Sequence, residues 1–187
     1  SATAAQSAYT RTMPPNLPAP QKQGFYEQAW DQASQGMTAE ANNPFNTFLA
    51  AEASMGLGNV ARADSLFKKT VQLCPEFAQE VTTASALLPE LAMESARVAL
   101  VERNDTMAAI AGWTLAVQLD STNIDANFYA GYFSLLRGDN ERAMPVFRRI
   151  LAMPAPPATD TNGVERRDVP VRAMLGYGGQ LFNQERS

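Results

Sequence analysis

The sequence predicts an all-α protein, a short α-solenoid of helical hairpins that follows an extended proline-rich arm. Three observations predict this class. Residues 25–153 are rich in Ala, Leu, Met, Gln and Glu, with apolar residues at i, i+3, i+4 and i+7. Pro, Gly and Asn-Asp or Gly-Asn pairs interrupt this pattern at the spacing of short antiparallel helices. Similar segments also recur along the chain, which is typical of repeat proteins.

The first segment, residues 1–24, is predicted to be an extended arm. It carries four prolines within seven residues and only two charged side chains, both basic. Each proline lacks an amide donor and clashes with the preceding turn, so the cluster should block a helix. Such a segment cannot form a core of its own, and we expect it to lie on neighbouring protein subunits. The candidate partner contacts in the arm are Arg11, Pro14, Pro15 and Lys22.

The next segments are similar to one another. Asn43 to Pro75 and Ile124 to Pro154 each have a first helix, a Gly-Asn or Gly-Asp turn, a second helix, and then Pro. In both, an Ala near the start of the second helix is followed four residues later by an aromatic. A third copy, Leu91 to Ser121, has Asn-Asp as its turn. The Ala and aromatic pairs are Ala63/Phe67, Ala109/Trp113 and Ala143/Phe147.

These segments resemble the tetratricopeptide repeat (TPR), whose helices cross at small residues and whose repeat length is 34 residues. Ala109 and Ala143 are 34 residues apart, and so are Ala29 and Ala63. Ala63 and Ala109 are 46 apart, so about twelve residues are inserted, carried by Glu76–Pro89. The small residues expected at helix crossings are Ala50, Ala51, Gly58, Ala130, Gly131 and Gly138.

This alignment divides the chain into three regions. Residues 1–24 are the arm and residues 25–153 are the repeats, with Gly24 to Pro44 as a leading second helix whose own first helix the arm replaces. Residues 154–187 begin with a proline-rich loop and are expected to end in a C-terminal capping helix within 171–183, although three glycines weaken it. Three hairpins plus a leading and a capping helix result.

Composition excludes several function classes. The chain has no His, which removes Ser-His-Asp and Cys-His nucleophile systems and His metal sites. Its net charge is −4 and its basic residues form no stripe, so we expect no nucleic-acid partner. No apolar run approaches the ~20 residues that span a bilayer. The chain begins at Ser1 without Met, as expected after removal of either Met or a signal peptide.

No catalytic residue, cofactor site or metal site is predicted. The single cysteine, Cys74, lies at the end of a predicted helix, where the helix dipole disfavours a thiolate, so we expect an inert thiol. Four residues of the late loop have acidic or amide side chains but lack the alternating ligands and closing Glu of a calcium loop. They are Asp160, Asn162, Glu165 and Asp168.

The resemblance implies a binding groove, because arrays of this family line their concave face with the first helix of each repeat. Members that grip a peptide's terminal carboxylate place Lys, Asn and Arg there, and this chain has none of these at the matching positions. The surface should instead be apolar and aromatic, either a groove for an apolar partner segment or a surface that the chain's own arm or C-terminal segment fills. The candidate groove residues are Phe45, Phe48, Glu52, Met55, Phe128, Tyr132 and Leu135, together with Leu91, Glu94, Val98, Val101 and Asp125.

The resemblance also implies a function. We expect a non-catalytic interaction or scaffold subunit that docks on a larger, membrane-associated complex of other protein subunits and stabilises it. The chain is similar in texture to TPR proteins of bacterial envelopes, so a periplasmic or envelope-associated, membrane-extrinsic place is expected, with the cytoplasm as the alternative. A narrower hypothesis is an extrinsic subunit of a photosynthetic reaction-centre or antenna complex. The alternative function is a soluble TPR adaptor or chaperone that binds peptides reversibly in its groove.

Overall fold

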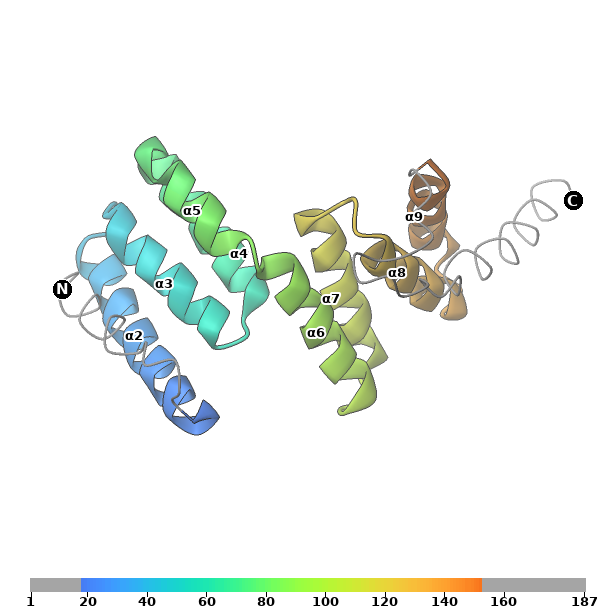
Figure 1. The fold of residues 1–187 in the computed structure, drawn as a ribbon, viewed down its shortest axis with the longest axis horizontal. Coiled ribbons are helices and arrows are strands. Elements are labelled where there is room, and N and C mark those ends of the chain that lie inside the picture. Colours follow the sequence, from blue (N-terminus) through green and yellow to red (C-terminus); the bar gives the residue numbers. More distant parts are fainter. Residues whose placement is uncertain (1–17, 153–187) are drawn as a thin grey trace, which may run out of the picture. The chain divides into compact units, whose positions relative to one another are not determined.

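A computed structural model describes residues 18–152, which form eight α-helices and one 3-10 helix (Figure 1). The chain divides between Ala92 and Met93 into two compact units, each described by itself below. Residues 1–17, with Arg11, Pro14 and Pro15, and the predicted loop and capping helix lie outside the described residues.

The first unit contains α2 (Ala19–Ala39), α3 (Pro44–Gly56), α4 (Val60–Leu73), the 3-10 helix η1 (Pro75–Phe77) and α5 (Ala78–Ser85). It ends with the first residues of α6 (Leu88–Val101). Helix α3 packs against both α2 and α4 (Figure 1). One of its core clusters consists of Ala33, Leu49 and Ala50, against which Trp30, Met37, Phe45 and Leu66 pack.

The start of α2 corrects the predicted arm. The arm was expected to extend to residue 24, but α2 begins at Ala19, with Pro20 in its first turn. A proline is tolerated there because the first amides of a helix have no intrahelical acceptor, and its fixed φ suits the helix. Residues 19–24 are therefore helical, and Lys22 is a half-buried helix residue, not part of an extended segment.

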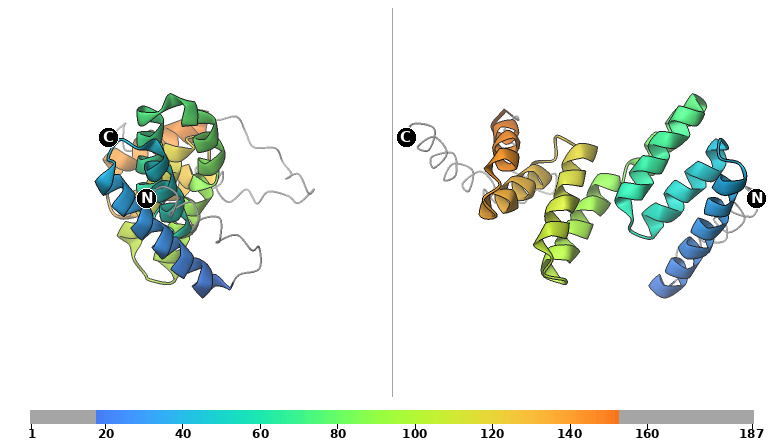
Figure 2. Two further views of the ribbon diagram at one scale, coloured as in Figure 1. Left: turned by 90° about the vertical axis from the view of Figure 1, so that its left-hand side faces the viewer. Right: turned by 180° about the vertical axis from the view of Figure 1, so that it is seen from behind.

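The second unit contains the remainder of α6, then α7 (Thr106–Leu119), α8 (Ile124–Leu136) and α9 (Asn140–Ala152). Helix α8 packs against both α7 and α9. The cluster between α8 and α9 consists of Phe128, Ala143, Phe147 and Ile150. Two further views show these antiparallel pairs within each unit (Figure 2).

The three hairpin turns obey one rule. Each contains a residue with positive φ, a conformation that glycine and asparagine adopt most readily: Gly58 (φ 73°), Asn104 (φ 51°) and Gly138 (φ 76°). The next residue caps the second helix, accepting a hydrogen bond from the amide three residues on. The three caps are Asn59 (3.3 Å), Asp105 (2.9 Å) and Asp139 (3.1 Å).

The packing after each turn confirms the predicted crossings. Ala63, Ala109 and Ala143 are all 0% exposed. The aromatics that follow them, Phe67, Trp113 and Phe147, are buried as well. A methyl group on Gly131 would lie 3.1 Å from the Phe147 ring, so glycine permits this close approach. The described chain is thus an all-α series of TPR-like hairpins, as the sequence predicted.

The inserted residues form a helix of their own. The extra length was assigned to Glu76–Pro89; it lies in η1 and α5, and Leu88 and Pro89 already belong to α6. None of the α5 residues is fully buried, and α5 contacts α4 and η1. The insertion is therefore a surface addition to the first hairpin.

Candidate interaction surfaces

The predicted groove residues of the first unit lie on α3, and most of them contribute to packing inside the unit. Phe45 is half-buried and packs on the cluster of Ala33, Leu49 and Ala50. The Phe48 ring lies 5.7 Å from the Phe67 ring and 5.8 Å from the Phe77 ring, measured between centroids. Because Phe77 belongs to the inserted η1, the chain's own insertion contacts this groove position.

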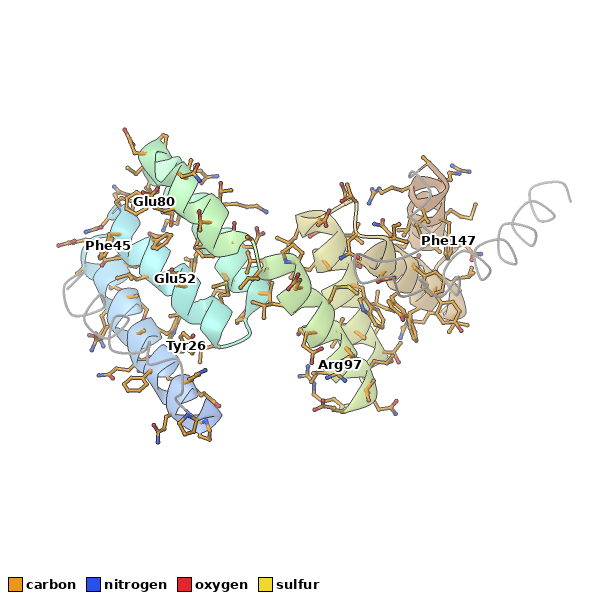
Figure 3. All side chains as sticks on the ribbon, viewed as in Figure 1. Tyr26, Phe45, Glu52, Glu80, Arg97 and Phe147 are labelled. Carbon is orange, nitrogen blue, oxygen red and sulfur yellow. The ribbon has the colours of Figure 1, made fainter. Side chains whose placement is uncertain are left out.

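The two other α3 positions differ in burial. Glu52 is 9% exposed and lies on the same helix as Phe45 (Figure 3). Met55 is half-buried near the end of α3. A carboxylate this buried is expensive to desolvate unless other groups compensate its charge, so Glu52 belongs to the interior of this unit.

The predicted groove residues of the second unit lie on α8. Phe128 is 7% exposed and belongs to the core that includes Phe147, which Figure 3 labels on α9. Tyr132 stacks on Phe128 with ring centroids 5.7 Å apart and planes at 16°. Leu135 packs against the same cluster. The first-helix pattern therefore located the hairpin core, and only the half-buried edges of Tyr132 and Leu135 reach the surface.

The remaining groove positions are more open. Leu91 and Val98 are half-buried, whereas Glu94, Val101 and Asp125 are exposed. Arg97 donates hydrogen bonds of 2.6 and 2.7 Å to Glu94, which lowers the pKa of that carboxyl (Figure 3 labels Arg97). Both side chains are more than half exposed, so this ion pair stabilises the helix only weakly.

Cys74 caps the end of α4 and is half-buried. Its Sγ donates a hydrogen bond of 3.0 Å to Glu76 Oε2. That bond, together with burial and the negative charge of Glu76, raises the pKa of the thiol above its ordinary value. The thiolate is therefore disfavoured here, which agrees with the expectation of an unreactive cysteine.

Asp120 has a structural role at the end of α7. It accepts hydrogen bonds from the Thr122 hydroxyl (2.6 Å) and the Thr122 amide (2.9 Å). These bonds lower the pKa of Asp120 below its usual range. The carboxylate thus fixes the turn that leads into α8.

Within residues 18–152, no three side chains of His, Cys, Asp or Glu gather closely enough to hold a metal ion. The four loop residues weighed as calcium ligands lie outside that range. Nor is any helix in the same range long and apolar enough to cross a membrane.

The structure adds a feature that the sequence analysis missed, a hollow of about 560 Å³ in the second unit. It is lined by Met107 and Ile110 of α7, by Ser134 and Arg137 at the end of α8, and by residues 138–142. Several large apolar side chains are exposed near helix ends in this unit: Val101 (67%), Met107 (52%) and Leu136 (59%). A position-by-position comparison of the repeats would have revealed the hollow, as shown below.

The comparisons with known proteins give a limited result. No family model matches the chain, and no curated protein matches it. A solved structure described as the crystal structure of MamA is 15% identical over 70% of this chain and 90% of its own, with a TM-score of 0.32. MamA 41-end from Desulfovibrio magneticus RS-1, and a structure described as MamA RS-1 ArsTM double mutant, are each 18% identical. Each covers 79% of this chain and 93% of its own, with a TM-score of 0.31. The TPR-like class accordingly depends on the turns and crossings described above.

Proposed function

We propose that this protein is a non-catalytic interaction subunit that docks on a larger protein assembly and helps to hold it together. One observation carries the proposal: the hairpins of the described chain repeat a single turn-and-crossing rule. Repeats of this kind contact mainly their neighbours and present extended surfaces, and such surfaces serve to bind other proteins.

The burial of the predicted groove residues supports a docking subunit over a reversible peptide adaptor. An adaptor needs open side chains on the first helices to grip a peptide. Phe48 and Phe128 instead pack against other rings of their own units. Peptide binding would then depend on the half-buried residues Phe45, Met55, Tyr132 and Leu135.

We also propose that residues 1–17 contribute to attachment. This segment precedes α2 and carries Arg11, Pro14 and Pro15 without any acidic residue. An extended segment of this length can reach about 55–60 Å at roughly 3.3–3.6 Å per residue, enough to cross a neighbouring subunit. Since Arg11 is its only charged side chain, attachment through this segment should depend only modestly on salt.

The experiment is purification of the tagged native protein in mild detergent, followed by measurement of mass and subunit stoichiometry. The proposal predicts recovery in a complex with fixed stoichiometry. A variant that lacks residues 1–17 but keeps α2 intact should leave that complex more readily. Unchanged helical content of this variant is the control for folding. If the full-length protein is recovered alone under these conditions, the proposal is wrong.

The host assembly and its place in the cell are narrower questions. We propose a membrane-associated host, with this chain held on the periplasmic side, and fractionation in the same experiment distinguishes the periplasm from the cytoplasm. Neither the described residues nor the comparisons support a photosynthetic host in particular.

A further inference from the structure

The two units can be compared residue by residue, because positions 80 residues apart correspond. Gly58 corresponds to Gly138, Ala63 to Ala143 and Phe67 to Phe147, and each pair has the same structural role. By the same offset, Trp30 of α2 corresponds to Ile110 of α7, and Arg62 of α4 corresponds to Arg142 of α9.

In the first unit, the space between these two second helices contains an indole ring. Trp30 packs against the cluster of Ala33, Leu49 and Ala50. The guanidinium carbon of Arg62 lies 4.4 Å from the centre of the Trp30 ring, which is a cation–π contact. Val60, at the start of α4, is buried beside this turn.

In the second unit, the corresponding space is the hollow of about 560 Å³. Ile110 replaces the indole and lines the hollow, and Asn140 replaces the buried Val60. Arg142 remains, with its side chain 72% exposed and its Nε 3.3 Å from Asp139. Among the described residues no aromatic ring lies beneath this guanidinium, so the cation is present without the ring that accompanies its counterpart.

We propose that this hollow receives a tryptophan side chain from a partner protein, which would occupy the place that Trp30 occupies in the first unit. The chemistry of the lining suits an indole. Ile110 and Met107 offer aliphatic and thioether contacts, and sulfur packs favourably at ring edges. Arg142 offers its guanidinium to the ring face, and tryptophan gives the strongest cation–π attraction. Ser134 and Asn140 supply polar groups for the main chain on either side of the ring.

The ring must come from another molecule. The chain has two tryptophans, Trp30 and Trp113. The first is packed under Arg62, and the second is stacked between Tyr129 and Phe133, with ring centroids 5.2 and 4.9 Å away. This site is separate from the predicted groove, so it goes beyond the docking function proposed above.

The test is a titration of the full-length ¹⁵N-labelled protein with N-acetyl-L-tryptophanamide, followed by NMR. The proposal predicts saturable shifts confined to the amides of residues 107–110 and 138–142. N-acetyl-L-leucinamide, the matched aliphatic probe, should bind at least several-fold more weakly. Equal responses to the two probes, or no saturable shift at these amides, would overturn the proposal.

Two variants sharpen the test. Arg142→Gln should weaken binding of the tryptophan probe about two- to fivefold, the usual range for an exposed cation–π contact. Arg62→Gln, the matched change at the corresponding position of the first unit, should leave binding unchanged because that cation already has its ring. Ile110→Trp should abolish binding by filling the hollow from within. If Arg142→Gln and Arg62→Gln behave alike, the assignment of the ring to Arg142 is wrong.

The outcome is independent of the docking experiment. Probe binding at residues 107–110 and 138–142 by a protein that purifies alone would support this site and contradict the docking proposal. A stable complex without probe binding would do the reverse.

Discussion

In the first unit, α2 and α3 approach each other closely where Gly36 faces Asn46. A methyl group on Gly36 would lie 2.7 Å from Asn46 Cγ. Asn46 is 1% exposed, and neither its side-chain nitrogen nor its oxygen has a hydrogen-bond partner. The corresponding residues of the second unit are Ala116 and Ala126, both fully buried. We therefore predict that Gly36→Ala and Asn46→Ala are strongly coupled, because together they reproduce the alanine pair.

The magnitudes follow from opposing effects. Gly36→Ala gains about 1 kcal/mol of helix propensity, but the clash with Asn46 costs about 1–3 kcal/mol, so this single variant should be neutral to about 2 kcal/mol less stable. Asn46→Ala removes two unpaired polar atoms, worth about 1–3 kcal/mol, and leaves a cavity that offsets part of that gain. In the double variant the new methyl group fills that cavity, and we expect about 2 kcal/mol more stability than the natural chain.

Urea denaturation of the four proteins followed by circular dichroism measures this double-mutant cycle. The predicted interaction energy is about 2 kcal/mol, well above the roughly 0.3–0.5 kcal/mol within which independent sites add. Additive effects, or a double variant less stable than both single variants, would show that Gly36 and Asn46 do not share one packing site.

Three further predictions concern single residues. Ala143→Leu should overpack the last hairpin and destabilise the protein by about 1–3 kcal/mol, whereas an unchanged melting temperature would contradict the repeat alignment there. Gly138→Ala should cost about 1–2 kcal/mol because its φ of 76° is unfavourable for alanine, and Gly138→Asn should cost less in the same melts. Asp120 has a lowered pKa, so its contribution is present above the ordinary pKa of about 3.9 and is lost as the pH falls through the folded-state value. Asp120→Asn should therefore flatten the fall in stability below about pH 4, and an equally steep fall would refute its role. Glu76→Gln should lower the pKa of Cys74 toward its ordinary value and speed its alkylation at pH 8, and an unchanged rate would show that Glu76 does not control the thiol.

The hairpins were predictable because their determinants are local. A residue suited to positive φ, a capping Asn or Asp and a small residue four positions later each leave a mark in the sequence at fixed spacing. Those marks placed Ala63, Ala109 and Ala143 correctly at 0% exposure. The start of α2 was missed because proline was treated only as a helix breaker, although Pro20 lies in the first turn, where the missing amide has no consequence.

The candidate sites were less predictable because the burial of a side chain depends on packing that spacing does not specify. The pattern of first-helix residues cannot distinguish an open groove from a filled one. It could not show that the inserted Phe77 contacts Phe48, or that Phe128 belongs to the core with Phe147. The hollow beside Ile110 arises from a large-to-small difference between corresponding positions, which becomes apparent only when Trp30 is seen to occupy the space in the first unit.

The mass of the protein purified gently from its native source tests the central claim most directly. The protein should elute with defined partners at a fixed stoichiometry, and a variant without residues 1–17 should show a larger free fraction while keeping its helical content. A full-length protein that elutes as a free 20.3 kDa monomer under the same conditions would contradict the claim that it is a docking subunit.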